Sequence, residues 1–349
     1  MGYIFYFSAL SGMKTAILTL IIFIASFVSL GQSSTLRIAF YNVENLFDIY
    51  DDPEKRDDEF LPGGIKGWNY DRYQCKLRHL YKTILAIEGE SRLAALGVCE
   101  LENCFVTRQL LEQTPLARRK FKFIQYESPD RRGVDVAFIY DPELIVPLHS
   151  QPITIRFPFD TAGRTRDILY VKAIVKNLDT MHFFVNHWPS RFGGLLATIP
   201  KRNFVASVVA GVCDSILNDD SGAKIIIMGD LNDDPEDESV LIHLQTKKSS
   251  LVNLMDDAHW KEPHGTLKHG SVWSIFDQIV VSDGLYNTEF GYEITGRTAH
   301  FCKAPFLFTE DPKSPGKKLF RTYSGMNYLG GFGDHLPVFI DVNIRPDGK

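Results

Sequence analysis

Short apolar runs that end in polar residues recur along the chain. One of them, KIIIMGDLNDDPED at 224–237, has three consecutive isoleucines followed by an acidic turn. A continuous apolar run of this length is typical of a strand buried on both faces. Asp230 and Asn232 lie two positions apart where that strand is expected to end, so both side chains can point the same way. An ordinary Asn-Asp-Asp-Pro turn explains the same residues, so this segment alone leaves turn and site both open.

The same pattern predicts the other elements of the fold. Strands are expected at 36–41, 93–99, 121–126, 134–140, 168–175, 181–186, 225–228, 276–281 and 336–342. Apolar residues at helical spacing predict helices at 73–87 and 204–217, with a short one near 239–244. Segment 292–326 has weak periodicity and is expected to form long loops or an insertion. Because strands follow each other in pairs with only occasional helices, two stacked mixed sheets covered by helices fit better than an alternating parallel sheet.

The N-terminus has the pattern of a secretory signal. Lys14 precedes an apolar run at 16–30, and Ser29 and Gly31 place small residues at the −3 and −1 positions of a cleavage site before Gln32. We therefore expect residues 1–31 to be a signal peptide and the protein to be exported to the periplasm or the extracellular space. Since residues 1–12 are also apolar, an uncleaved membrane anchor is the alternative. Residues 32–349 show no linker or repeat and are expected to form a single domain.

Composition narrows the classes of function. The net charge is −5, and it becomes −6 once the single lysine of residues 1–31 is removed, so a nonspecific nucleic-acid coat is excluded. Any bound phosphate must be held by a local cluster or a metal. The five cysteines show no spacing typical of zinc. Cys99 and Cys213 lie in apolar runs and are expected to be buried thiols, whereas a Cys104–Cys302 pair is left open.

Polar residues follow many of the expected strands, and loops at one edge of stacked sheets can bring such residues into one pocket. Carboxylate and amide oxygens without cysteine suit Mg²⁺ or Mn²⁺ better than structural zinc. Asp277 and His335 can form an orienting pair, and together these groups fit attack of water on a phosphate ester. A serine hydrolase fits less well, because no Gly-x-Ser-x-Gly elbow occurs. The set is Asn42, Glu44, Glu100, His187, Asp230, Asn232, Asp277, Asp334 and His335.

These residues lie in motifs that resemble, in order, those of the endonuclease/exonuclease/phosphatase superfamily. The superfamily includes deoxyribonuclease I, exonuclease III type enzymes, sphingomyelinases and inositol polyphosphate 5-phosphatases. The resemblance spans about residues 36–342. The sequences NVENLFD, RGVDVA and NHWPSR are especially similar to those of exported bacterial members described as nuclease-like. The motifs are NVENLFD at 42–48, the strand-terminal Glu100, NHWPSR with His187, GDLND at 229–233, WSIFDQIVVS at 273–282 and GDHLP at 333–337.

The resemblance implies an α/β fold, a four-layered α/β sandwich with two stacked mixed β-sheets flanked by helices, in which residues 32–349 are one catalytic domain. It further implies metal-dependent hydrolysis of phosphodiesters or phosphomonoesters. By motif position, Glu100 is the principal Mg²⁺ ligand, and Asn42 and Glu44 hold the metal and its waters. Asp334 is expected at the metal, either directly or through a water.

The same motifs imply roles in proton transfer and phosphate binding. Asp230 is expected to orient or deprotonate the attacking water, and Asn232 to donate a hydrogen bond to a phosphate oxygen. His335, oriented by Asp277, is expected to bind the phosphate and transfer a proton. His187 occupies the place of a histidine that serves the leaving group in the deoxyribonuclease I branch, which argues against a DNA-repair role.

Arginine and tryptophan side chains are further candidates for substrate contacts. Of five arginines near the motifs, we expect Arg132 and Arg191 to contact phosphate and the others to be solvated. Tryptophans can stack on bases, although packing is the expected role of each one. The arginines are Arg131, Arg132, Arg164, Arg166 and Arg191, and the tryptophans are Trp68, Trp188, Trp260 and Trp273.

Three functions compete at this point. The first is an exported, Mg²⁺-dependent nuclease with DNA or RNA as substrate and no obligate protein partner. The second is an exported phosphatase or phosphodiesterase acting on a lipid headgroup, inositol phosphate or other small ester, and the third is a catalytically silent binding module. Segment 292–326 can decide between the first two, because a basic groove there favours nucleic acid, whereas a closed pocket or an apolar tip favours a small ester or a lipid.

Overall fold

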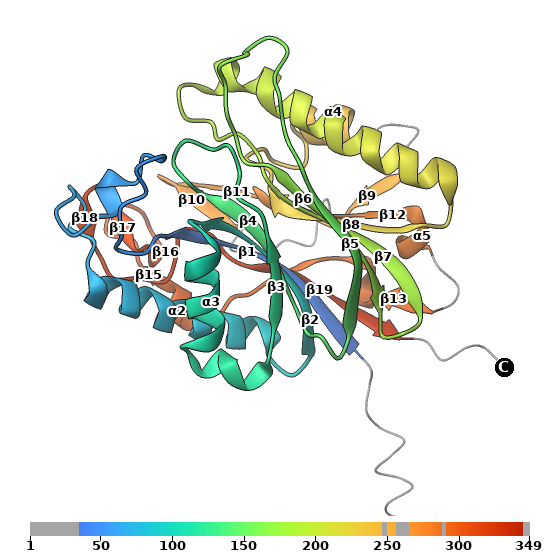
Figure 1. The fold of residues 1–349 in the computed structure, drawn as a ribbon, viewed down its shortest axis with the longest axis horizontal. Helices are drawn as coiled ribbons and strands as arrows, with labels where there is room; N and C mark the ends of the chain where they lie inside the picture. Colours follow the sequence, from blue (N-terminus) through green and yellow to red (C-terminus); the bar gives the residue numbers. More distant parts are fainter. Residues whose placement is uncertain (1–34, 246–249, 256–264, 288–290, 345–349) are drawn as a thin grey trace, which may run out of the picture. The chain divides into compact units, whose positions relative to one another are not determined.

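Two β-sheets stacked face to face organise residues 36–349, which form one unit. The computed structural model describes residues 35–245, 250–255, 265–287 and 291–344, so the signal peptide or anchor expected at 1–31 lies outside the described residues. Figure 1 shows the two sheets between helices on either side. The expected four-layered α/β sandwich is therefore confirmed.

The first sheet has the strand order β13-β19-β1-β2-β4-β3, with β14 paired to β19. Its central strands β1 and β2 run parallel, whereas β2 and β4 are antiparallel, so the sheet is mixed as expected. The bounds are β1 (Thr35–Leu46), β2 (Arg92–Leu101), β3 (Lys122–Gln125), β4 (Asp135–Tyr140), β13 (Tyr292–Ile294), β14 (His300–Phe301) and β19 (Val338–Ile344).

The second sheet has the strand order β5-β6-β7-β8-β12-β9. Strands β7 and β8 run parallel at its centre, and β12 is antiparallel to β8. The bounds are β5 (Ile145–Ile153), β6 (Ile168–Val175), β7 (Asp179–His187), β8 (Lys224–Asp230), β9 (Leu251–Asn253) and β12 (Asp277–Ser282).

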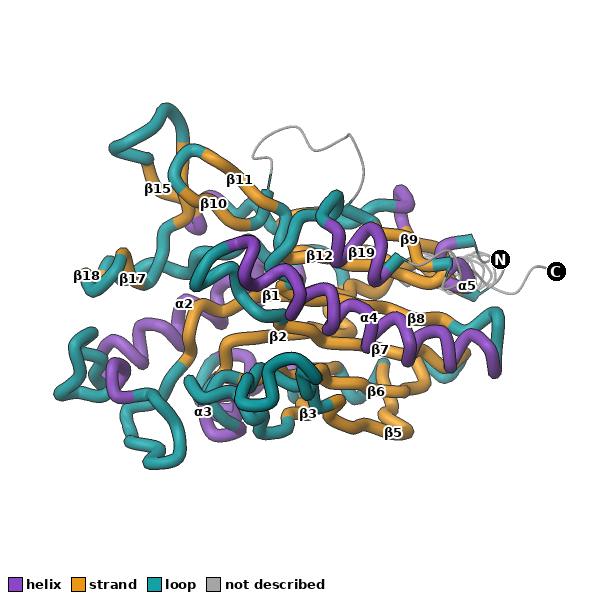
Figure 2. The backbone as a smooth tube through the Cα atoms, turned by 90° about the horizontal axis from the view of Figure 1, so that it is seen from above, coloured by secondary structure: helices purple, strands orange, loops and turns teal. Residues whose placement is uncertain are grey.

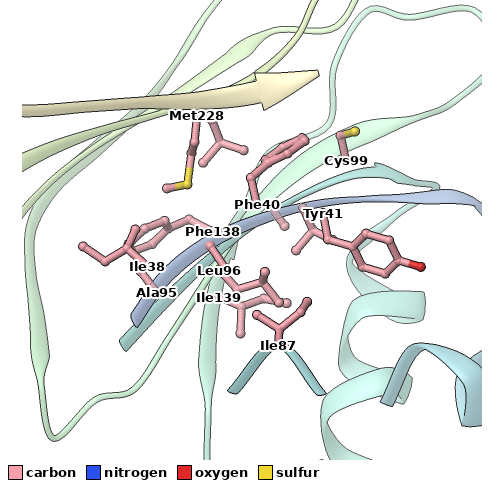
Figure 3. Packing of buried hydrophobic residues seen from close by; sticks show 14 of the residues in the cluster. Ile38, Phe40, Tyr41, Ile87, Ala95, Leu96, Cys99, Phe138, Ile139 and Met228 are labelled. Atoms are coloured by element: carbon pink, nitrogen blue, oxygen red, sulfur yellow. The ribbon is translucent and has the colours of Figure 1, made fainter. Parts of the chain in front are cut away.

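Strand β8 explains why its sequence is apolar without alternation. Ile226 and Met228 point into the core between the sheets, whereas Ile225 and Ile227 belong to a second core on the outer face. Both faces of the strand are covered, so both sets of side chains must be apolar. Figure 3 shows Met228 facing Phe40 and Phe138 of the opposite sheet.

The two sheets approach closely where β2 lacks a side chain. A Cβ atom added at Gly97 would lie 2.9 Å from the sulfur of Met228 and 3.1 Å from the ring of Phe40. These distances are shorter than normal van der Waals contacts, so glycine is required for this packing. The close approach brings the ends of β1 and β2 near the ends of β7 and β8.

Helices cover the outer faces of both sheets. α2 (Tyr70–Glu88) and α3 (Cys104–Glu112) pack on the first sheet. α4 (Leu195–Asp219) packs on the second sheet through Val205, Val209 and Cys213 (Figure 1). By length and composition alone, α4 is the one helix in the described ranges that could span a membrane, a test that helices packed on a protein core also pass.

The remaining elements are short. α5 (Asp283–Tyr286) follows β12, and a π-helix occupies Ser239–Leu244 where a short helix was expected. Segment 292–326, expected to form long loops or an insertion, consists of loops that carry strands of two or three residues and short 3-10 helices. Its hairpins are β15 (Phe308–Glu310) with β16 (Lys317–Leu319), and β17 (Tyr323–Ser324) with β18 (Asn327–Tyr328), which follows the segment. A further hairpin, β10 (Leu267–His269) with β11 (Val272–Ser274), precedes this segment. The 3-10 helices are Asp58–Phe60, Pro115–Arg119, Thr295–Arg297 and Pro305–Leu307.

Several boundaries differ from those that the sequence predicted. α4 begins at Leu195, nine residues before the predicted start. The first turns were not predicted, because Gly194 and Pro200 are residues that usually interrupt a helix. β5 and α3 were not predicted at all. All five cysteines are free thiols, so the Cys104–Cys302 pair that was left open does not form, and Cys99 and Cys213 are buried as expected.

Candidate functional site

Strands from both sheets end at one common edge, and their ends carry the polar residues that the sequence analysis singled out. In the first sheet, Asn42 of β1 lies beside Cys99 of β2, one residue before Glu100. In the second sheet, Asp230 of β8 pairs with His187 of β7 on one side and with Asp277 of β12 on the other. The order of the strands therefore brings these residues together.

The backbone at this edge departs from regular strand geometry. The β1–β2 register shifts between Asn42 and Leu46, and the β2–β4 register shifts on either side of Glu100. Glu44, Glu100 and Asn232 have positive φ angles of 53°, 64° and 52°. Such conformations cost about 1–3 kcal/mol each in non-glycine residues and gather at functional sites. Their side chains therefore do not follow the regular alternation of a strand.

Asp230 lies at the centre of the site and is 2 % exposed. Its Oδ2 accepts a hydrogen bond from Asn42 Nδ2 at 3.0 Å, and its Oδ1 accepts one from the Asn232 backbone N–H at 3.0 Å. Burial raises the pKa of Asp230 to about 6, the positive charge of His335 opposes this, and the negative charge of Asp277 adds to it. The carboxylate is thus ionised at neutral pH and close to the range suited to a general base.

His335 and Asp277 form the expected pair. His335 Nδ1 lies 2.6 Å from Asp277 Oδ2, and its Nε2 lies 3.9 Å from Asp230 Oδ2. Burial alone would lower the pKa of His335, but the carboxylates of Asp277 and Asp230 outweigh it and hold the pKa well above the ordinary value. At neutral pH the ring is a cation with Nε2 facing the site.

His187 lies on the opposite side of Asp230. Its Nε2 is 3.7 Å from Asp230 Oδ2 and 3.7 Å from Glu100 Oε1, longer than hydrogen-bond distance. Burial and the guanidinium of Arg166 lower the pKa of His187 well below the ordinary value, so this ring is neutral. The two histidines of the site therefore differ in charge.

Glu44 and Asp334 form a second cluster beside the first. Glu44 Oε2 accepts a hydrogen bond from the Thr322 backbone N–H at 2.6 Å and lies 3.8 Å from Lys76 Nζ. Arg321 donates to Asp334 Oδ2 at 2.6 Å. Burial and the charge of Asp334 raise the pKa of Glu44. A small pocket of about 220 Å³ opens here, lined by Glu44, Arg321 and Asp334 among others.

Lys76 and Arg321 were missed by the sequence analysis. Lys76 is fully buried and donates to Thr322 Oγ1 at 2.6 Å and to the Phe332 carbonyl at 3.0 Å. A signal was present, because Lys76 lies three residues after Tyr73 and four before Leu80 on the apolar face of α2. A lysine on such a face needs a buried partner.

The arginine side chains differ from the prediction in their partners and in their burial. Arg191 donates to the Asn232 carbonyl at 2.9 Å and to Asp237 at 2.6 Å, so it holds the turn after β8 and is engaged by protein groups rather than free for phosphate. Arg132 is half-exposed and lies 3.6 Å from Asp130. Arg166 was expected to be solvated but is buried, and it donates to the carbonyls of His187 and of the following residue.

Asn232 lies in the site in a fixed orientation. Its side-chain Nδ2 donates to the Trp188 carbonyl at 3.1 Å, and its backbone is held by Asp230. Trp188 is buried and donates to Asn186 through its ring N–H, so the packing role expected for it is confirmed. The predicted site residues thus lie in two adjoining clusters. Around Asp230 are Asn42, Glu100, His187, Asn232, Asp277 and His335, and around Arg321 are Glu44 and Asp334.

The donor set fits a hard divalent cation. Asp230 with Asp277 and His335, and Asp230 with His187 and Cys99, bring candidate ligand atoms within 4.8 Å of one another. Burial keeps Cys99 protonated by raising its pKa well above the ordinary value, which leaves mainly oxygen donors. Glu100 Oε2 accepts a hydrogen bond from the Asn45 backbone N–H at 2.9 Å, while its Oε1 lies on the side of His187. A cation bound here would stabilise the ionised form of the buried carboxylates and so lower their raised pKa values.

Comparison with known proteins agrees with this geometry. The sequence profile of the Endonuclease/Exonuclease/phosphatase family matches residues 37–344, so the chain belongs to that family. Its members hydrolyse phosphate esters and generally depend on divalent metals. No curated protein sequence matches the chain.

Solved structures share the fold at low sequence identity. The human Nocturnin catalytic domain with bound sulfate has a TM-score of 0.55 and 16% identity over 90% of this chain and 97% of that chain. A mannosyl-6-phosphatase from Bacteroides thetaiotaomicron has a TM-score of 0.56 and 13% identity over 88% and 99%. D. rerio TDP2 complexed with a single-strand DNA product has a TM-score of 0.54 and 14% identity over 89% and 99%. At these identities the likeness shows the fold alone.

Proposed function

We propose that the protein is an exported, Mg²⁺-dependent phosphodiesterase that cleaves DNA or RNA, with Mn²⁺ as an alternative metal. The position of Asp230 carries the proposal. A carboxylate with a pKa of about 6 lies between a cationic imidazole and a set of amide and carboxylate groups. This arrangement suits attack of water on a phosphate ester.

Each residue then has a defined task. Asp230 accepts the proton of the attacking water, and Asn42 holds the Asp230 carboxylate in place. His335 faces the phosphate with a charged N–H and stabilises the negative charge that develops there. Asp277 fixes the ring through Nδ1. His187, being neutral, serves the leaving group as a hydrogen-bond donor.

A divalent cation held by Glu100, with Asn42, Glu44 and Asp334 nearby, would neutralise the phosphate and lower the pKa of a bound water. The charges of Lys76 and Arg321 already compensate Glu44 and Asp334 in part. Glu100 lacks a lysine or arginine partner among the described ion pairs, which supports it as the principal ligand.

A small phosphate ester is the second candidate substrate. The pocket of about 220 Å³ beside Arg321 would accommodate a compact phosphate group, and Arg321 is the residue suited to bind it. Membership of the family is compatible with both substrates. Export rests on residues 1–31 alone and is part of the proposal.

Parallel assays of the purified protein with Mg²⁺ separate these substrates. Plasmid DNA, RNA, sphingomyelin and inositol phosphates are incubated at equal concentrations, with and without EDTA. The proposal expects cleavage of DNA or RNA that EDTA abolishes. Hydrolysis of inositol phosphate or sphingomyelin alone would establish the second candidate instead, and inactivity toward every phosphate ester would contradict both.

A further inference from the structure

A pocket of about 650 Å³ lies between two hairpins next to the site described above. One hairpin is β10–β11, and the other is β15–β16, which belongs to the segment expected to decide the substrate. Figure 2 shows the labelled strands β10, β11 and β15 projecting on the same side of the sheets, and β10 lies against β16. The pocket is separate from the smaller one beside Arg321.

The lining of the pocket combines positive charge with aromatic surface. It contains three lysines, Trp273 and Phe308, and no acidic residue is part of this lining within the described ranges. Lys268 joins the two hairpins, since its Nζ donates to Asp311 Oδ2 at 2.9 Å and to the Lys317 carbonyl at 3.2 Å. Lys268 Nζ also lies 5.8 Å from the centre of the Trp273 ring, and Lys317 in the same lining is exposed, so positive charge and aromatic surface lie side by side in the pocket.

Both walls of the pocket continue directly into the catalytic groups. Leu267 of β10 forms an antiparallel β-bridge with His335, and the Asp277 backbone N–H donates a hydrogen bond to Thr266 Oγ1 at 3.1 Å. Trp273 precedes Asp277 by four residues, so their Cα atoms are at most about 14 Å apart along an extended chain. On the other wall, Lys317 precedes Arg321 by the same number of residues.

We propose that this pocket binds the nucleotide adjoining the scissile bond of a single-stranded nucleic acid, with Trp273 stacked on the base and Lys317 facing the backbone phosphates. Stacking platforms combined with lysine charge are the usual means of holding single strands without sequence preference. A small phosphate ester bound at Asp230 would leave the pocket unused. The inference rests on the proposed function and assigns its substrate as a polymer.

The pocket explains how a protein of net charge −5 can bind a polyanion. Affinity for nucleic acid depends on local positive charge rather than on the total. Here Lys317 supplies positive charge from the β15–β16 hairpin, whose residues are not part of the carboxylate cluster. A substrate can therefore be held by its neighbouring nucleotide while its scissile phosphate lies among the acidic groups.

Binding and cleavage are measured separately to test the inference. Trp273→Ala and Lys317→Ala are compared with Val272→Ala and Lys318→Ala, which change neighbouring residues that do not line the pocket. Affinity for fluorescein-labelled single-stranded DNA and RNA is measured by anisotropy with Mg²⁺ in an Asp230→Asn background. Cleavage of the same oligonucleotides and of bis-p-nitrophenyl phosphate is measured with Asp230 intact.

The inference expects Trp273→Ala to weaken oligonucleotide binding at least about tenfold, in line with the loss of one stacked base, and Lys317→Ala to weaken it through the loss of a phosphate contact. Their KM for oligonucleotides should rise correspondingly more than their KM for the small ester, while the two controls retain wild-type affinity. Unchanged binding in both pocket variants would overturn the inference, as would equal losses on both substrates. If the protein binds oligonucleotides through Trp273 but cleaves only the small ester, the proposed function fails while the pocket assignment stands.

Discussion

His335 Nδ1 and Asp277 Oδ2 lie 2.6 Å apart, although Asp277 begins β12 of the second sheet and His335 precedes β19 of the first. The pair therefore forms only when the two sheets are stacked in their native arrangement. Asp277 is fully buried, and its other oxygen has no hydrogen-bond partner within the described part of the chain. A buried carboxylate of this kind strongly favours the charged imidazole.

Replacing this carboxylate tests its influence on the ring. Asp277→Asn removes the negative charge but keeps the shape of the side chain, so the pKa of His335 should fall by at least one unit. We expect the kcat for a phosphodiester to fall about a hundredfold, because the imidazole loses its orientation and charge. Titration of the histidine ring signals by NMR measures the pKa, and a wild-type value would rule out the orienting role.

Lys76 should be essential for folding of the second cluster. Glu44 has two cationic neighbours at 3.8 Å, Lys76 and the half-exposed Arg321, and Lys76→Met removes the fully buried one. Leaving a buried charge with no partner costs about 3–5 kcal/mol, and because Arg321 remains we expect the free energy of unfolding, measured with urea, to fall by less than that. The double variant Lys76→Met with Glu44→Gln should recover part of the loss, and a double variant no more stable than Lys76→Met would show that Glu44 is not the partner that matters.

Some helices and strands of the fold could be predicted from the sequence, and others could not. β8 was predicted in its place, because a run covered on both faces is apolar throughout, although the strand extends beyond the apolar run to Lys224 and Asp230. β5 was missed, because it is an edge strand with Pro147 and Pro152 and a largely exposed surface, which gives no apolar pattern. α3 is short and was missed, although the side chain of Asn103 caps its first turn.

The candidate site could be predicted in composition but not in its contacts. Motif order placed the residues around Asp230 at one edge, and the structure brings them together there. It could not show that Arg321 pairs with Asp334, because Arg321 comes from a segment whose strands are two or three residues long. Nor could it show that Arg191 is engaged by the acidic turn, since the sequence gives no distance between that turn and the end of β7.

Stability should depend on pH through a histidine outside the site. His182 on β7 is bonded to Tyr170 at 2.8 Å, and burial, with the charge of Lys172, lowers its pKa to about 4. The unfolded chain takes up this proton near pH 6.5, whereas the folded protein does so only near pH 4. The free energy of unfolding should therefore fall by about 3 kcal/mol between pH 6.5 and pH 4 on account of this residue.

The variant His182→Gln checks that contribution. It keeps a hydrogen-bond acceptor for Tyr170 but cannot titrate, so this part of the pH dependence should disappear. Urea unfolding at pH 4.5 and pH 7 provides the measurement. A pH dependence identical to that of the wild type would show that other groups cause the loss of stability in acid.

Divalent metal should bind in a way that is detected without an assay of activity. We expect Mg²⁺ or Mn²⁺ to raise the Tm of the protein, because a ligand that binds only the folded state stabilises it. Glu100→Gln should abolish this increase, while Glu143→Gln, which changes an exposed residue paired with Arg92, should retain it. A metal-induced increase in Tm that survives Glu100→Gln would remove Glu100 from the metal site.

The most direct test of the account is the turnover of Asp230→Asn on a phosphodiester, measured beside Asp237→Asn in the turn that follows. Asp230 is assigned to the attacking water, whereas Asp237 accepts a hydrogen bond from Arg191 and has no assigned catalytic role. We predict that Asp230→Asn lowers kcat at least about a hundredfold with an unchanged circular dichroism spectrum, and that Asp237→Asn stays within about threefold of the wild type. Wild-type turnover in a folded Asp230→Asn protein would contradict the central claim that this carboxylate activates the water.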